Sequence, residues 1–180
     1  MNTIRYALSL RLLHWIIAAL VIALVTIGLW MVNRAQADLW DDLTNTLYAW
    51  HKALGFAVLL LMIARLIVRL ISNTPPPAAS LSPALRRISR GVHALLYLLL
   101  LAVPLLGWAG VSAFPALIIV EGINLPSMPG IPEDQSLAKR FFEIHSTLAI
   151  ALAALALLHI AAAIKHRWIN KDEVFDRMRL

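Results

Sequence analysis

The amino-acid sequence predicts an all-α integral membrane protein whose core is a four-helix bundle. Of its 180 residues, 61% are hydrophobic and 14% are charged, whereas soluble chains average about 45–50% and about 25%. Apolar runs of about 20 residues, enough to cross a bilayer, occur four times. The chain has no Cys, which excludes a disulfide scaffold, a thiolate metal site and covalently attached c-type haem.

The predicted membrane spans cover residues 12–32, 48–71, 92–111 and 141–164. The connections between them contain several Asp residues after the first span, and Pro or Gly residues after the second and third, which is typical of loops. Pro104 lies inside the third span and is expected to bend it, because a membrane helix tolerates proline. No repeat or second domain is visible, so we predict one membrane domain over residues 1–180.

Basic residues are distributed unevenly between the two sides of this predicted bundle. Twelve of the 16 lie near the termini or the second connection, and only Arg34, Lys52, Lys139 and Arg140 lie on the other side. The positive-inside rule therefore predicts that both termini are cytoplasmic. The basic surface fits anionic membrane lipid, and no nucleic acid is expected as a partner.

The N-terminal segment also resembles a secretory signal, since residues 35–37 read Ala-Gln-Ala after an apolar run. That run is about 21 residues long, whereas the apolar core of a signal peptide has about 7–15. We therefore interpret residues 12–32 as a retained membrane span.

Histidines fall at two depths of the predicted bundle. His145 and His159 are fourteen residues apart on the fourth span, a spacing that returns to within about 40° of one helix face while rising about 21 Å. His51 matches the depth of His145, and both His14 and His93 match the depth of His159. Ionisable groups at membrane depth are costly and usually functional.

Paired imidazoles on facing helices predict two haem b groups, each held by two histidines in the bundle core. Two alternatives are interhelical hydrogen bonds and a zinc clip. Small residues on the stripe of His14, among them Gly28, would leave width for a porphyrin, although they also serve helix packing. Arg65 lies on the same face as His51, fourteen residues further on, where it would bind haem propionates or lipid headgroups.

Spacing alone leaves the inner ligand open between His14 and His93. A histidine that does not ligate iron there could donate protons to a quinone, and His166, at the inner surface, is a second candidate for that role. For both, contact with solvent or headgroups is the simpler interpretation.

Motifs along the whole chain resemble the bacterial cytochrome b561 family of four-helix proteins. The similar features run from about residue 5 to residue 178 and include Arg11-Leu-Leu-His14-Trp15, His51-x-x-x-Gly55, His93-x-x-x-Tyr97, Gly107-Trp108, and His145 with His159. The resemblance implies that His51 and His145 bind an outer haem b, that His14 and His159 bind an inner one, and that His93 lies beside a quinone site.

Members of this family are haem b electron carriers of the bacterial inner membrane, and one type oxidises periplasmic superoxide and reduces ubiquinone. The resemblance therefore implies a periplasmic electron donor and a quinone acceptor. If the donor is superoxide, Lys139, Arg140 and Lys52 would attract the anion. One alternative is a periplasmic redox protein or larger dehydrogenase docked on the apolar connection of residues 112–140. A non-redox helical membrane protein is the other.

Overall fold

The computed structural model describes residues 5–180, and four long helices account for most of them. These helices are α1 (Leu8–Gln36), α2 (Asp42–Ile71), α3 (Pro83–Ala113) and α4 (Gln135–Ile164). All four are long and apolar enough to cross a membrane. Within residues 5–180 there is no strand, only an isolated bridge between Ile118 and Asn124. The predicted helical membrane fold is confirmed.

Each helix is longer than the apolar run that predicted it. Helices α2, α3 and α4 begin at polar capping residues outside the apolar segments, whereas α1 begins after Ala7 without a side-chain cap. Asp41 accepts a hydrogen bond from the Thr44 amide, Ser82 from the Leu85 amide, and Asp134 from the Leu137 amide. Such side chains satisfy amide groups that a helix start leaves without partners. Pro104 lies inside α3.

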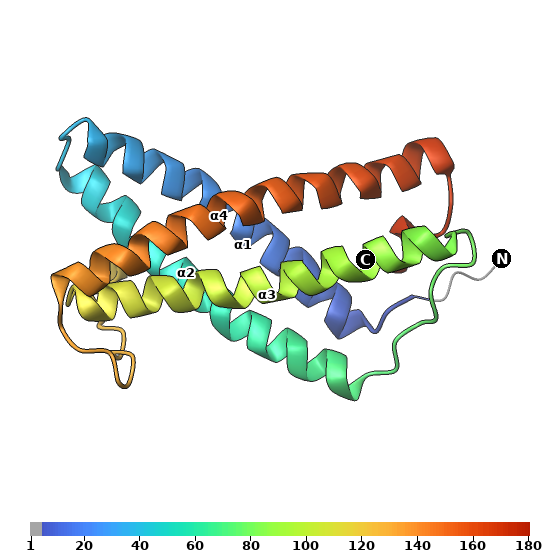
Figure 1. Cartoon of the computed structure of the whole chain (residues 1–180), viewed down its shortest axis with the longest axis horizontal. Helices are drawn as coiled ribbons and strands as arrows, with labels where there is room; N and C mark the ends of the chain where they lie inside the picture. The colour runs from blue at the N-terminus through green and yellow to red at the C-terminus, as the bar shows by residue number, and fades with distance from the viewer. Residues whose placement is uncertain (1–4) are drawn as a thin grey trace.

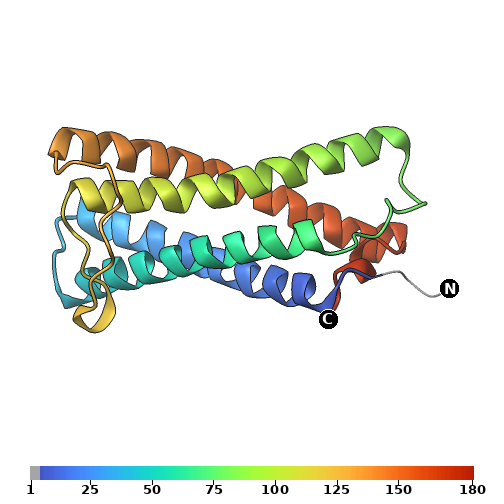
Figure 2. The same ribbon diagram turned by 90° about the horizontal axis from the view of Figure 1, so that it is seen from below.

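The helices alternate in direction, so the bundle has two distinct ends (Figures 1 and 2). We call the end with the α1–α2 and α3–α4 connections the outer end, and the end with both termini and the α2–α3 connection the inner end. Helix α1 packs on α2, α3 packs on α4, and α2 packs on α3.

Two apolar clusters form the core. One joins α1 to α2 through Ile17, Val58 and Met62, and the other joins α3 to α4. Large hydrophobic side chains elsewhere are exposed, including Leu70 and Ile150. An apolar exterior around a small core is the arrangement of a protein whose solvent is lipid.

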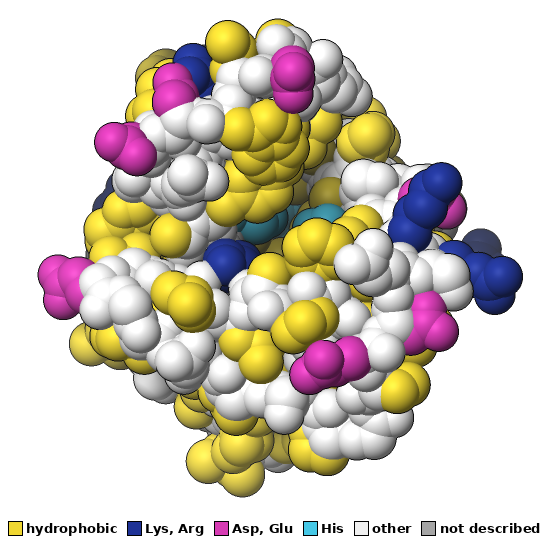
Figure 3. Space-filling model, turned by 90° about the vertical axis from the view of Figure 1, so that its left-hand side faces the viewer, with side chains coloured by type: hydrophobic (Ala, Val, Ile, Leu, Met, Phe, Trp, Pro, Cys, Tyr) yellow, Lys and Arg dark blue, Asp and Glu magenta, His cyan; other side chains and the backbone are white. Residues whose placement is uncertain are grey.

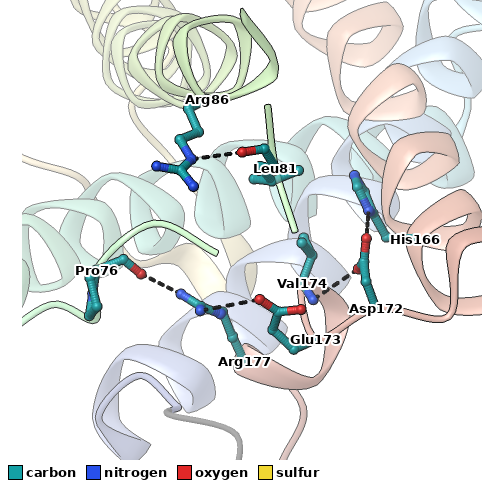
Figure 4. A network of polar contacts seen from close by, with 8 residues as sticks. All are labelled: Pro76, Leu81, Arg86, His166, Asp172, Glu173, Val174 and Arg177. Atoms are coloured by element: carbon teal, nitrogen blue, oxygen red, sulfur yellow. Dashed lines mark hydrogen bonds and ion pairs between the residues drawn. The ribbon is translucent and has the colours of Figure 1, made fainter. Parts of the chain in front are cut away.

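The C-terminal segment lies at the inner end, where Arg177 joins it to the α2–α3 connection (Figure 4). Helix α4 continues into a π-helix, Lys165–Asn170, and the chain then turns at Lys171, whose φ is 51°. After a short 3₁₀ helix, Phe175–Arg177, the segment lies against α1, where Trp15 Nε1 donates to the Met178 carbonyl at 2.9 Å. Arg177 donates to the Pro76 carbonyl of the α2–α3 connection.

The α3–α4 connection folds over the outer end. Trp108 Nε1 donates to the Pro126 carbonyl at 2.7 Å, and the Met128 amide donates to Ser112 Oγ at 2.9 Å. The turn of its short hairpin is a 3₁₀ helix, Val120–Gly122, in which Glu121 and Gly122 have φ of 57° and 74°. These bonds hold the connection close to the helix ends.

Candidate functional site

Two pairs of histidines face each other inside the bundle. At the outer level, His51 of α2 and His145 of α4 have ring centroids 6.1 Å apart and planes at 76°. At the inner level, His14 of α1 and His159 of α4 have centroids 6.2 Å apart and planes at 83°. The structure thus brings together the outer pair that the sequence spacing predicts and the inner pair that the family resemblance implies.

The ring separations fit two imidazoles that share one metal ion. Metal–imidazole bonds of about 2.0 Å, together with the half-widths of the two rings, put the centroids about 6 Å apart. Among residues 5–180, no group of three or more His, Cys, Asp or Glu side chains could hold a metal ion. Two protein ligands on opposite sides suit haem, because the porphyrin supplies the other four.

His93 is the third imidazole at the inner level. Its ring centroid lies 5.3 Å from that of His159, which is shorter than the separation of either other pair. Its Nδ1 lies 3.3 Å from Ser89 Oγ, one turn earlier on α3, and the residue is exposed. The geometry therefore matches His14 better than His93 to the role of second ligand opposite His159.

Two glycines make room for the outer histidine rings. A Cβ atom added to Gly107 of α3 would lie 3.1 Å from Cε1 and Nδ1 of His145, and one added to Gly28 of α1 would lie 3.1 Å from Cε1 of His51. Both contacts are tighter than ordinary van der Waals packing. The sequence singled out Gly28 only as a small residue on the stripe of His14, whereas its position opposite His51 appears only in three dimensions.

The same glycine on α3 lets His145 reach a backbone carbonyl. His145 Nδ1 lies 2.9 Å from the Val103 carbonyl oxygen, and Gly107 is four residues after Val103, one turn along the same face. A proton donated from Nδ1 leaves Nε2 free as a ligand and fixes the ring orientation. His51 Nδ1 is also buried and faces Gly28, and Leu24, one turn earlier on α1, is its neighbouring backbone acceptor.

Arg65 lies at the inner level, as its position in the sequence predicts. It donates to the Leu10 carbonyl on α1, one turn before His14. Its Cζ is 5.8 Å from the centroid of the Tyr97 ring on α3, and the Cζ of Arg69 is also 5.8 Å from it. Arg69 therefore shares the Tyr97 ring with Arg65.

His166 does not extend into free solvent. Its Nδ1 lies 2.7 Å from Asp172 Oδ2 (Figure 4), and both side chains are largely buried. A surface cavity of about 300 Å³ lies next to this pair, lined by Arg167, Trp168, Lys171, Asp172 and Asp176. The structure thus holds His166 by its contact with Asp172. His93 lies instead at the level of the inner pair.

The outer end has a hollow with histidine side chains at its bottom (Figure 3). A cavity of about 570 Å³ on this end lies between the start of α2 and the hairpin, and Lys52 and Glu121 are among its lining residues. Lys52 Nζ donates to the carbonyl oxygens of Ala116, at 2.8 Å, and Ile118. Acidic side chains are spread around the periphery of this end of the molecule (Figure 3).

The other predicted outer cations lie on the first turns of α4. The Lys139 side chain is 80% exposed, and its Nζ lies 4.0 Å from Glu143 Oε1. Arg140, the next residue, is also exposed. Neither residue belongs to the cavity beside Lys52, so the three basic residues do not form one cluster around it.

The fold and the paired core histidines define a class of protein, a four-helix membrane protein built to hold a planar group between facing imidazoles. A family model described as prokaryotic cytochrome b561 matches residues 5–179. The chain belongs to the prokaryotic cytochrome b561 family. It is a transmembrane electron-transfer cytochrome, and the family implies haem b as its cofactor.

Named relatives cover nearly the whole chain. "Cytochrome b561 homolog 2" of Escherichia coli is 31% identical over 175 residues, which are 97% of this chain and 90% of that protein. "Probable superoxide oxidase CybB" of Yersinia pestis is 29% identical over 170 residues, covering 92% and 90%. "Cytochrome b562" of Cereibacter sphaeroides is 28% identical over 170 residues, covering 92% and 89%.

Proposed function

We propose that this protein carries electrons across the bacterial inner membrane through two haem b groups, from a periplasmic donor to ubiquinone. His51 and His145 would hold the outer haem, and His14 and His159 the inner one. The observation that carries the proposal is the repetition of one geometry, with ring centroids 6.1 Å and 6.2 Å apart at two levels of the bundle. Haem b with two imidazole ligands supplies reversible one-electron chemistry.

The spacing of the two levels supports transfer across the membrane. Fourteen residues of α4 separate His145 from His159, a rise of about 21 Å. The hydrocarbon core is about 30 Å thick, so both levels fit inside it, one toward each surface. Each histidine pair joins α4 to another helix, so one rigid bundle would hold both haems. Electron transfer between them would then need no conformational change.

The inner end offers groups for quinone reduction. Ubiquinone takes up two protons with two electrons, so its site needs a proton donor. His93 is exposed beside the inner pair and lies near Ser89, which supports this role. His166 is the second candidate, and Asp172 would hold it in one orientation. Arg65 would bind the inner haem through its guanidinium group.

Superoxide is the donor that we propose first. One relative bears the name probable superoxide oxidase, and Lys52 lines a cavity at the outer end, where its charge would attract an anion. Lys139 and Arg140 would add to that attraction at longer range. Oxidation of superoxide to dioxygen releases one electron, so two such events supply one quinone reduction.

A periplasmic redox protein is the second candidate for the donor, and two observations favour it. The outer side has 7 acidic and 4 basic residues, and Lys139 lies beside Glu143. Ile118 and Ile123 of the hairpin are 59% and 58% exposed. An apolar centre with charged surroundings is the composition of a protein interface.

The haem count and the ligands can be tested together on the purified protein. Pyridine haemochrome absorption should give two haems b per chain, and one haem or none would contradict the proposal. In His14→Ala, the inner haem should lose its low-spin spectrum, whereas His93→Ala should keep both low-spin spectra. The reverse pattern would make His93 the ligand and leave the two-haem model standing.

The donor requires a separate kinetic test. Rapid mixing with superoxide should reduce the haems of the oxidised protein, and ubiquinone should then reoxidise them. Lys52→Gln should slow the reduction at low ionic strength and have less effect at high salt, because salt screens the attraction. Haems that stay oxidised with superoxide, but are reduced by an isolated periplasmic redox protein, would favour the second candidate.

A further inference from the structure

Two arginines of α2 converge on one tyrosine of α3. The Cζ atoms of Arg65 and Arg69 each lie 5.8 Å from the centroid of the Tyr97 ring. The two residues are one turn apart on α2. Both guanidinium groups lie over one side chain of the neighbouring helix, Arg65 as a half-buried residue and Arg69 as an exposed one.

The charge at this point is not balanced by the protein. Among residues 5–180, no carboxylate lies within 4.0 Å of Arg65 or Arg69. Each guanidinium group has five N–H donors. Arg65 donates to the Leu10 carbonyl, which leaves most of its donors unused. Cations at membrane depth are costly unless an anion pairs with them.

Tyr97 contributes a further donor without a partner. Its hydroxyl oxygen is buried, and no group among the described residues forms a hydrogen bond with it. Buried hydroxyls almost always have a partner. Two guanidinium groups therefore lie over the ring of a tyrosine whose hydroxyl has no partner, and donors of this kind are the chemical complement of a carboxylate or a phosphate.

We propose that Arg65, Arg69 and Tyr97 form a carboxylate clamp for the propionate groups of the haem held at the inner histidine pair. This inference rests on the proposed function, because it requires a haem between His14 and His159. Haem b has two propionates, which match the two guanidinium groups in number and in charge. The clamp is at the correct level, since Arg65 contacts the carbonyl one turn before His14.

The clamp predicts a specific change in reduction potential. A positive charge near a haem favours the reduced form, because reduction adds an electron, so loss of the Arg69 charge should lower the inner potential. In redox titrations of the purified protein, Arg69→Gln should lower one of the two midpoints by about 59 mV, a tenfold change for one electron, and leave the other unchanged. The affected midpoint should be the one that His14→Ala removes.

Haem retention gives a second readout that does not depend on activity. Transfer of haem to an excess of apomyoglobin should be about tenfold faster for the inner haem of Arg69→Gln than for wild type. Tyr97→Phe keeps the ring and loses only the hydroxyl, so it should accelerate this transfer about threefold, the value of one hydrogen bond. It therefore tests the clamp even if the arginine variants fold poorly.

Two further variants serve as controls. Arg87 is exposed near the start of α3, so Arg87→Gln removes one inner-end charge and should leave both midpoints unchanged. Arg69→Lys keeps the charge and should lower the inner midpoint less than Arg69→Gln does. A midpoint that falls equally in Arg87→Gln would show a general charge effect and overturn the clamp.

The experiments distinguish haem propionates from a lipid phosphate as the ligand of the clamp. Unchanged midpoints and haem transfer in both Arg69→Gln and Tyr97→Phe would overturn the clamp, and a simultaneous loss of co-purified anionic lipid would assign these donors to a phosphate headgroup. Fewer than two haems in the wild-type chain would instead overturn the proposed function. The two failures are therefore distinguishable.

Discussion

The packing of single residues against the imidazole rings determines how the outer histidines are oriented. Gly107 leaves the space in which His145 reaches the Val103 carbonyl. His51 has a glycine opposite its ring too, Gly28, and Leu24 lies one turn before that glycine on α1. A bonded Nδ1 raises the basicity of a ligating imidazole, so on the proposed function Gly107 would influence the ligand strength of His145 through this bond.

Substitution of Gly107 tests this arrangement. In Gly107→Ala, the added methyl group would displace the His145 ring and weaken its bond to Val103, so we expect the outer haem to be lost at least tenfold more readily, as for other residues that orient metal ligands. Haem content and the low-spin absorption of each haem are the measurements. Gly91→Ala is the matched control, because nothing lies within 4 Å of an added Cβ there. Equal haem content in the two variants would contradict the prediction.

Sequence patterns identified these residues only in part. The five histidines at membrane depth follow from span length and helical spacing, because both are one-dimensional properties. The partners of their rings come from other helices, and helix spacing does not encode which residues of two helices face each other. For this reason only the structure shows that Gly107 lies opposite His145 and that two arginines lie over the Tyr97 ring.

At the scale of the elements, the start of α2 depends on a local polar network. Asp41 caps the helix through the Thr44 amide and pairs with Arg34, whose Nη2 lies 2.5 Å from Asp41 Oδ2. Thr44 is fully buried and links Arg34 to the Leu39 carbonyl. The network joins the end of α1 to the start of α2, and so holds the helices that carry Gly28 and His51 in register.

This cap should make stability depend on pH. The Thr44 amide, and then the Arg34 guanidinium, lower the pKa of Asp41 from 3.8 to about 2. The carboxylate therefore stabilises the folded state fully above the unfolded pKa of 3.8, and this stabilisation is lost as the pH falls toward about 2. We expect Asp41→Ala to lower the melting temperature at neutral pH, and the difference from wild type to shrink as the pH falls through this range.

Thermal unfolding in detergent, followed by circular dichroism, measures this difference. Asp42→Ala is a suitable control, since Asp42 is the neighbouring acidic residue and Asp41 is the cap. A difference between Asp41→Ala and wild type that is independent of pH would show that the cap acts without its charge.

The ends of the elements are the part of the fold that apolar runs predict poorly. The predicted span of residues 48–71 begins six residues after the start of α2 at Asp42, because the first turns contain polar residues that a hydropathy pattern excludes. The hairpin that begins at Ile118 depends on positive φ angles at Glu121 and Gly122, and the turn after α4 depends on a positive φ at Lys171. Neither has an apolar periodicity from which to predict it.

For the whole molecule, the distribution of charge predicts the orientation in the membrane. The inner end has 12 basic and 3 acidic residues, and the outer end has 4 and 7. Fusion of green fluorescent protein to the C-terminus should give fluorescent cells, because that protein folds in the cytoplasm, while alkaline phosphatase fused there should be inactive. Phosphatase inserted at the hairpin of residues 118–124 should be active. The opposite result would reverse the outer and inner assignments and the direction of electron flow.

The inner-end network also has a consequence for biosynthesis. The segment after α4 links α1 to the α2–α3 connection. Its Met178 carbonyl accepts a hydrogen bond from Trp15 of α1, and its Arg177 donates one to the Pro76 carbonyl of the connection. This segment leaves the ribosome after all four helices have been made. The inner end therefore stays open during translation, and on the proposed function a haem at the His14–His159 pair would enter through this end before the segment closes it.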